Sequence, residues 1–200
     1  MPRVGLTTER IVLEGADLAD ALGLERLTLV AIAERVGVAQ PSLYKHIPGL
    51  DALRRELAVL GLRELTERLL QATAGKACHD ALRAMADAYR RYAHEHPGRY
   101  QASVLAPEPD DAEHTQASAR ILAVAAAVLD GYGISGADAI DAIRALRAAL
   151  HGYVVLERIG GYRIPRSRDT SFDRLVSILD DGLTNWNEPG PRSAPTNAGP

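Results

Sequence analysis

The sequence lacks the features that mark secreted and membrane-spanning proteins. Its single cysteine, Cys78, cannot form an internal disulfide, which suits a reducing compartment. No segment approaches the run of about 18 apolar residues that a membrane-spanning helix requires. Residues 1–9 show no apolar run behind a basic start, so no secretory signal is expected. We therefore expect a cytoplasmic protein with no membrane partner.

Lysine is scarce, and one stretch of the chain has no acidic residue. The only lysines are Lys45 and Lys76, and the net charge of the chain is -3 at pH 7. That balance does not favour a nucleic-acid-binding protein, because such domains are often basic. Between Arg35 and Leu50, however, no acidic residue occurs, whereas Lys45 and His46 do. A gap of this length also arises by chance, so its meaning depends on the motif that it contains.

Alanine and leucine are abundant, and they occur at the spacing of amphipathic helices. Hydrophobic residues make up 46% of the chain, which is enough for a packed core rather than disorder. Alanine and leucine favour helix over sheet, and the sequence shows no strand pattern, so we predict an all-α fold. Ser171 is the expected cap of the last helix. The predicted helices cover residues 8–22, 29–36, 40–46, 50–73, 79–96, 99–105, 113–132, 137–159 and 171–187.

Two short predicted helices near the N-terminus are joined by a turn at Gly37, which is the arrangement of a helix-turn-helix. In this motif the second helix enters the major groove of DNA, and its outward side chains contact bases and phosphates. Leu43 is expected to face the core with Ile32 and Val36. Spacing alone is more typical of an ordinary surface helix with polar side chains. The side chains left to face DNA are Gln40, Pro41, Ser42, Tyr44, Lys45 and His46.

Residues 27–53 read LTLVAIAERVGVAQPSLYKHIPGLDAL and resemble the N-terminal domain of TetR-family transcriptional repressors. The resemblance rests on the Ile-Ala pair, the glycine turn and the Leu-Tyr-Lys-His segment. Many members carry a lysine at the start of the next helix, where this chain has Leu50. That departure removes a phosphate contact, so affinity would depend on Tyr44, Lys45 and Arg3. The DNA contacts that the resemblance implies are Thr28, Gln40, Pro41, Tyr44, Lys45 and His46.

Residues 137–186 resemble, less closely, the C-terminal domain of a TetR subfamily known for a Trp-His-Gly motif. Leu150 stands here in the tryptophan position, before His151 and Gly152. The resemblance implies that the last two helices pair with those of a second copy in a four-helix bundle. The residues expected in that interface are Leu150, Phe172, Leu175, Leu179 and Leu183.

The resemblance also implies that a small, largely apolar ligand binds in the helical core. Tyr89, Tyr92 and His151 are the candidate contacts, although each is equally typical of an ordinary core position. Gly152 costs about 1 kcal/mol relative to alanine inside a helix, so it indicates either a close helix approach or a cavity wall.

Other candidate sites are weak. His94 and His96 are two residues apart, so on a helix they point to different faces and are not expected to bind a metal. No set of serine, histidine and aspartate has catalytic spacing. We expect neither an enzyme nor a bound cofactor.

These observations predict three parts: a DNA-binding domain at 1–52, a regulatory and dimerisation domain at 53–187, and a disordered tail at 188–200. The function that they favour is a ligand-responsive repressor that binds a near-palindromic operator in double-stranded DNA as a homodimer. The alternative is a helical small-molecule-binding or scaffold protein with a degenerate helix-turn-helix. Leu50 and the acidic balance favour that alternative.

Overall fold

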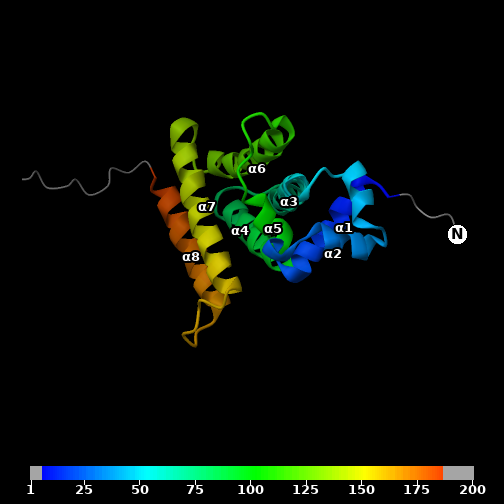
Figure 1. Cartoon of the computed structure of the whole chain (residues 1–200). Helices are drawn as coiled ribbons and strands as arrows, with labels where there is room; N and C mark the ends of the chain where they lie inside the picture. Colours follow the sequence, from blue (N-terminus) through cyan, green and yellow to red (C-terminus); the bar gives the residue numbers. More distant parts are fainter. Residues whose placement is uncertain (1–5, 187–200) are drawn as a thin grey trace, which may run out of the picture.

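The computed structural model describes residues 6–186, and every regular element in that range is a helix (Figure 1). The prediction of an all-α fold is confirmed. Arg3 and the predicted tail at 188–200 lie outside the described residues. The elements are α1 (Thr8–Leu22), η1 (Leu24–Arg26), α2 (Leu29–Val36), η2 (Gln40–Lys45), α3 (Leu50–Thr73), α4 (Cys78–Glu95), α5 (Pro97–Ser103), α6 (Ala112–Asp130), α7 (Gly136–Arg158) and α8 (Arg168–Thr184).

Threonine caps and glycine stops define the first two α-helices. Thr7 accepts a hydrogen bond from the Arg10 backbone N–H, and Thr28 accepts one from the Ala31 backbone N–H at 3.2 Å. Gly37 ends α2 with a φ of +75°, a conformation that costs glycine little. This turn sets η2 against α2, and Leu43 packs with Ile32 and Val36 as predicted. The core of this part also contains Ile11, Ala16, Leu27, Ile47, Leu53 and Leu57.

The predicted helix at 40–46 is present as the 3₁₀ helix η2 rather than as an α-helix. Its backbone bonds span three residues, as in the bond from the Ser42 N–H to the Ala39 carbonyl oxygen at 2.8 Å. Pro41 occupies the first turn, where its missing N–H leaves no bond unmade. Because the segment is short, the tighter form is a normal outcome.

Helix α3 connects the N-terminal core to a second core in the rest of the chain. Leu53 and Leu57 pack in the first core, whereas Leu65 and Leu69 pack in the second with α4, α6, α7 and α8. Figure 1 shows α7 and α8 side by side at the end of the molecule opposite α1 and α2. Among residues 6–186, no helix is long and apolar enough to cross a membrane.

A buried ion cluster joins α4 to α7 and α8. The Glu157 carboxylate is almost fully buried and accepts two hydrogen bonds from Arg90 and one from His94, if that ring nitrogen carries the proton. Arg90 pairs in addition with Asp169 and lies over the Phe172 ring. The Arg90 guanidinium holds the pKa of Glu157 below its ordinary value. The buried charge is therefore fully compensated.

The short helix α5 packs closely against both α1 and α3, and a glycine allows the close approach at each contact. A Cβ atom on Gly98 would overlap the backbone of Ala19 in α1, and one on Gly61 in α3 would overlap the Arg99 carbonyl oxygen. Asp20 in α1 accepts hydrogen bonds from the backbone N–H groups of Gly98 and Arg99, at 2.8 and 2.9 Å. Helix α5 and helix α1 are therefore joined backbone to backbone, and we call this contact the α1–α5 joint.

One predicted helix start is wrong. Helix α8 begins at Arg168 with Ser167 as its cap, and the Ser167 hydroxyl accepts from the Thr170 N–H at 3.3 Å. Ser171, the predicted cap, lies inside the helix and donates its hydroxyl back to the Ser167 carbonyl oxygen. Both residues are serines one turn apart, so the capping preference could not distinguish them.

Candidate DNA-binding surface and ligand cavity

The outward side chains of η2 form a compact exposed surface. Tyr44 is 51% exposed, and Pro41 and Lys45 are also exposed, whereas Leu43 is buried beneath them. Gln40 is half-buried and donates to the Tyr44 hydroxyl at 3.3 Å. Because Leu43 fixes the segment to the core, the polar side chains are presented from a rigid base.

Two further residues of the predicted DNA contact set border this surface. Thr28 is exposed at the start of α2, where its oxygen accepts a backbone bond and its hydroxyl proton remains available to a phosphate. His46 ends η2, is half-buried, and accepts a bond from the Thr8 hydroxyl through its carbonyl oxygen. Ser42 is half-buried on the same segment.

The basic residues of the acid-free stretch do not all contribute positive charge. Arg35 pairs with Glu14 and Asp17 of α1, so its charge is compensated within the fold. Lys45 makes no ion pair with any described residue, which leaves it as the free cation of η2. Leu50 is half-buried against the N-terminal core, so the residue at this departure position serves packing.

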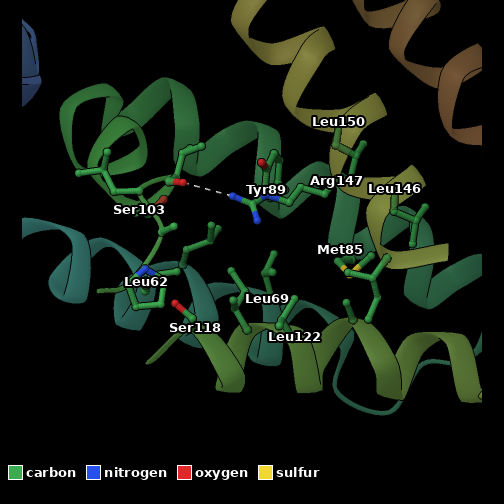
Figure 2. A pocket seen from close by; sticks show the side chains of 18 residues that line it. Leu62, Leu69, Met85, Tyr89, Ser103, Ser118, Leu122, Leu146, Arg147 and Leu150 are labelled. Carbon is green, nitrogen blue, oxygen red and sulfur yellow. Dashed lines mark hydrogen bonds between the residues drawn. The ribbon is translucent and has the colours of Figure 1, made fainter. Parts of the chain in front are cut away.

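A cavity of about 370 Å³ lies in the second core, within the usual range for small-ligand sites. Its walls come from α3, α4, α5, α6 and α7, together with the loop after α5, and Figure 2 shows their side chains converging on one space. Most are apolar. The lining residues are Leu62, Leu65, Leu69, Met85, Tyr89, Ser103, Val104, Leu105, Ala106, Pro107, Ser118, Ile121, Leu122, Ala125, Ile143, Leu146, Arg147 and Leu150.

The three predicted ligand contacts fall in different places. Tyr89 lines the cavity, and its hydroxyl lies 2.9 Å from that of Tyr100. The Tyr100 hydroxyl in turn lies 2.6 Å from Nδ1 of His151, so His151 stands behind the wall, two hydrogen bonds from the cavity. Burial, and then the charge of Arg147, lower the pKa of His151 below its ordinary value of 6.5. Nδ1 of the neutral ring can accept a hydrogen bond from the Tyr100 hydroxyl.

Tyr92 does not lie in the cavity, which corrects the expectation that it shares one site with Tyr89. It is buried on another side of α4, where its hydroxyl donates to Glu64 of α3 at 3.0 Å. Burial raises the pKa of the Tyr92 hydroxyl most, and the negative charge of Glu64 raises it further. Its role in this structure is to tie α4 to α3.

Three of the five residues predicted for a subunit interface are buried inside the chain itself. Phe172 is 1% exposed, Leu183 is 4% exposed and Leu150 lines the cavity. Side chains that are already covered offer no surface to a partner, so the expectation is corrected for these three. Leu175 and Leu179 are half-buried and keep an outward part.

Other apolar side chains are exposed on α7, on α8 and at Ile159, which directly follows α7. Ile178 is 66% exposed and Ile159 is 72% exposed, with Ile140 and Leu156 also exposed. A Cβ atom on Gly152 would meet no atom within 4 Å, so the predicted close approach or cavity wall at Gly152 is not found within the chain. We call this surface, with Leu175 and Leu179, the α7–α8 face.

Arg147, Ser118 and Tyr100 are functional candidates that the sequence analysis missed. Arg147 and Ser118 have other polar residues close by in the sequence, such as Arg144 and Gln116, so the sequence offers no signal that distinguishes them. Conversely, His94 and His96 bond to Glu157 and Asp20, which are far apart in the sequence. No group of three metal-binding side chains occurs within residues 6–186.

Comparison with known proteins identifies relatives across most of the chain. Residues 82–179 match a family described as tetracyclin repressor-like, C-terminal domain. An uncharacterised HTH-type transcriptional regulator of Mycobacterium tuberculosis is 40% identical over 156 residues, which cover 78% of this chain and 72% of the relative. One from Bacillus subtilis is 37% identical over 155 residues, which cover 78% of this chain and 81% of the relative.

Solved structures show the same fold. A Rhodococcus protein of unknown function has a TM-score of 0.72 at 21% identity, covering 93% of this chain and 98% of its own. A variant of TetR from Acinetobacter baumannii, crystallised with minocycline, has a TM-score of 0.70 at 21% identity, covering 91% and 98%. With the curated relatives and the C-terminal family match, these findings establish that the chain belongs to the TetR family of DNA-binding transcriptional regulators.

Proposed function

We propose that the chain is a repressor that binds a near-palindromic operator as a homodimer and releases it when a small molecule occupies the cavity. The observation that carries this proposal is the position of α5. Its first residues are fixed to α1 of the DNA-binding part, whereas its last residue, Ser103, and the following Val104 line the cavity. A change in cavity shape thus acts on a helix that touches both parts.

The proposed DNA contacts are those of η2 and its border. Gln40 can pair with an adenine, Lys45 can reach a guanine or a phosphate, and Tyr44 can donate to a phosphate. The exposure of Tyr44 and Lys45 supports this proposal, as does the absence of an ion partner for Lys45 within the described residues. Thr28, Pro41, Ser42 and His46 complete the proposed contact set.

The proposed homodimer forms through the α7–α8 face. Exposure of isoleucine side chains to water costs free energy, which a second subunit would recover by covering them. Gly152 has no side chain and therefore leaves room for a second helix to approach closely. An isologous pairing of this face would place two η2 segments on opposite sides of a two-fold axis, which suits a palindromic site. We propose the same division as before, with residues 1–52 binding DNA and 53–187 sensing and pairing.

The only two lysines of the chain provide a matched test of DNA binding. Lys45→Ala should weaken binding to the DNA upstream of the gene and reduce the salt dependence of affinity by about one phosphate contact. Lys76→Ala removes the same charge from an exposed site at the end of α3, where its ammonium donates to the Ala72 carbonyl oxygen. Gel shifts over a series of salt concentrations measure both.

Equal binding by the two lysine variants would reject η2 as the DNA reader. If the parent protein itself binds no DNA from that region, the alternative of a helical ligand-binding or scaffold protein with a degenerate helix-turn-helix takes its place. Leu50, which packs inward where many relatives carry a lysine, is the feature that favours this alternative.

Ile178→Glu tests the proposed pairing without disturbing the subunit. Its side chain is 66% exposed, so a carboxylate costs the single chain little, but it would place two charges in an apolar seam. Light scattering should show monomers. Gel shifts should show weaker binding to the operator. Ile164→Glu, in the exposed loop before α8, serves as the control and should leave the dimer intact. A dimer that tolerates Ile178→Glu would exclude this face.

A further inference from the structure

The cavity has one charged residue in its lining, and that residue is a cation. Its inner part is formed by buried apolar side chains, among them Leu69, Met85 and Leu146. Arg147 lines it from α7, and no aspartate or glutamate is among the lining residues. A molecule in this space therefore meets a hydrocarbon interior and a single positive charge.

Arg147 lies at the mouth of the cavity rather than in its depth. It is exposed to solvent, as are Leu105 and Leu122, which line the cavity beside it. In Figure 2 its side chain reaches from α7 across the space towards Ser103, where a dashed line joins it to a carbonyl oxygen. That oxygen belongs to Val104, which accepts from Nη2 at 3.3 Å.

Arg147 differs from other arginines that join helices of this fold in having no carboxylate partner among residues 6–186. Arg90 pairs with Glu157 and Asp169, and Arg55 pairs with Asp111. Arg147 makes no ion pair with any residue from 6 to 186, and its one hydrogen bond is a long one to a neutral carbonyl. Its fork of N–H donors keeps most of its capacity for a carboxylate.

The positive charge of Arg147 also reaches the groups behind the wall. It lowers the pKa of His151, after the larger effect of burial, and it opposes the rise that burial causes in the pKa of Tyr89. With a neutral His151 and neutral tyrosines, the wall carries no negative charge to offset it. An anion entering this cavity meets attraction and no opposing carboxylate.

We propose, building on the ligand-responsive function above, that the cavity binds an apolar monocarboxylic acid whose carboxylate pairs with Arg147. An organic cation would be repelled, and a neutral molecule would leave the guanidinium without a partner. A phosphate monoester would bring two negative charges to one positive charge. Carboxylate and guanidinium match in charge and in bidentate geometry.

The position of Arg147 sets the orientation of the bound acid. Its hydrocarbon body enters the space beside Leu69, Met85 and Leu146, where burial of apolar surface stabilises it. Its carboxylate stays at the mouth, partly in water, so the desolvation cost is small. Ser118 of α6 also lines the cavity, and its hydroxyl has no hydrogen bond within residues 6–186.

Binding of the acid would withdraw Arg147 from the Val104 carbonyl oxygen. Val104 directly follows α5, so the lost bond frees the end of the helix whose start is fixed to α1. Occupancy of the cavity would thus act on the C-terminal end of α5, whose N-terminal end forms the α1–α5 joint.

Isothermal titration calorimetry of the full chain without DNA tests the proposal. The probes are octanoate, dodecanoate and 1-naphthoate below their micelle concentrations, with 1-dodecanol as the neutral match and dodecylamine as the cationic one. At least one acid should bind saturably at one site per chain, and dodecanoate should bind more tightly than the alcohol and the amine. The proposal is overturned if no acid saturates, or if the alcohol binds as tightly as the acid.

Two variants of α7 separate the role of Arg147 from general effects. Arg147→Gln should weaken binding of the acid by about tenfold or more, because a charged hydrogen bond is lost, while binding of the alcohol stays unchanged. Arg147→Lys should recover part of the loss. Arg144→Gln, three residues earlier on the exposed side of the same helix, should have no effect. Equal affinity of the parent and Arg147→Gln for the acid would also reject the proposal.

Because these titrations contain no DNA, they are independent of repression. Acid binding that persists when the gel shift fails would remove the proposed repressor function and keep the ligand class. An operator complex that forms normally while no acid binds would do the reverse.

Discussion

The two ends of α5 are packed in opposite ways. At its start, Gly98 lies so close to α1 that no side chain fits, and Asp20 fixes its backbone by two hydrogen bonds. At its end, Ser103 and Val104 border a cavity of about 370 Å³. A tightly packed contact transmits displacement because it cannot be compressed, whereas a cavity can change shape at low cost. In the function proposed above, a change of shape at the cavity would reach α1 through the joint.

The largest effect is expected from crowding the tight end. Gly98→Ala places a methyl group on the backbone of Ala19, which cannot rotate away, so the free energy of unfolding should fall by about 3 kcal/mol. Gly15→Ala is the control in α1, since its Cβ would lie 3.4 Å from Leu53 in ordinary contact. Urea unfolding monitored by circular dichroism compares them. Equal stability of the two variants would mean that the backbone of α1 moves away from the added methyl group, which would contradict a rigid joint.

A smaller effect of opposite sign is expected from filling the hollow end. Ala125→Leu adds a side chain to the cavity wall on α6, and it should raise the free energy of unfolding by about 1 kcal/mol while weakening ligand binding. Ala127→Leu makes the same change on the exposed side of that helix and should be near neutral. Thermal melts measure both variants. A loss of stability in Ala125→Leu would show that the cavity has no room to fill.

The smallest expected effect is a pH dependence that arises from His151. Its pKa is lower in the folded chain than its ordinary value of 6.5, so the unfolded chain binds the proton more readily. The contribution of neutral His151 to the stability of the folded chain is therefore complete above pH 6.5 and is lost as the pH falls below that value. His151→Gln should therefore flatten the decrease of Tm between about pH 7 and pH 5. His79→Gln, at an exposed site, gives the comparison, and a slope unchanged by His151→Gln would contradict the assignment.

The N-terminal part of the fold could be predicted almost completely from sequence. Thr28, Gly37 and Pro41 each impose a local geometry that does not depend on distant residues, so α2, its turn and η2 appear where they were expected. The burial of Leu43 followed from the same local geometry. The 3₁₀ character of η2 was not foreseen, since six residues can close in either form, and the short 3₁₀ helix η1 was not predicted.

The cavity could be predicted only in part, because periodicity gives a buried face but not the partner that covers it. Phe172 and Leu183 lie on an apolar stripe as expected, yet the covering elements belong to the same chain. Tyr89 and Tyr92 are one turn apart, and small differences in direction send one to the cavity and the other to Glu64. Arg147 has no local signal of its role, because the cavity that it borders is completed by four other helices and one loop.

The α1–α5 joint is built from atoms that most substitutions leave in place. Its central contacts are the backbone of Ala19, the backbone of Gly98 and Arg99, and the Asp20 carboxylate, and the Arg99 side chain adds ion pairs with Asp17 and Asp20. The cavity wall is instead made of side chains from five helices and one loop. In the proposed function, substitutions in the cavity wall would change the ligand while the contact between α5 and α1 stays the same, so recognition and response would evolve separately.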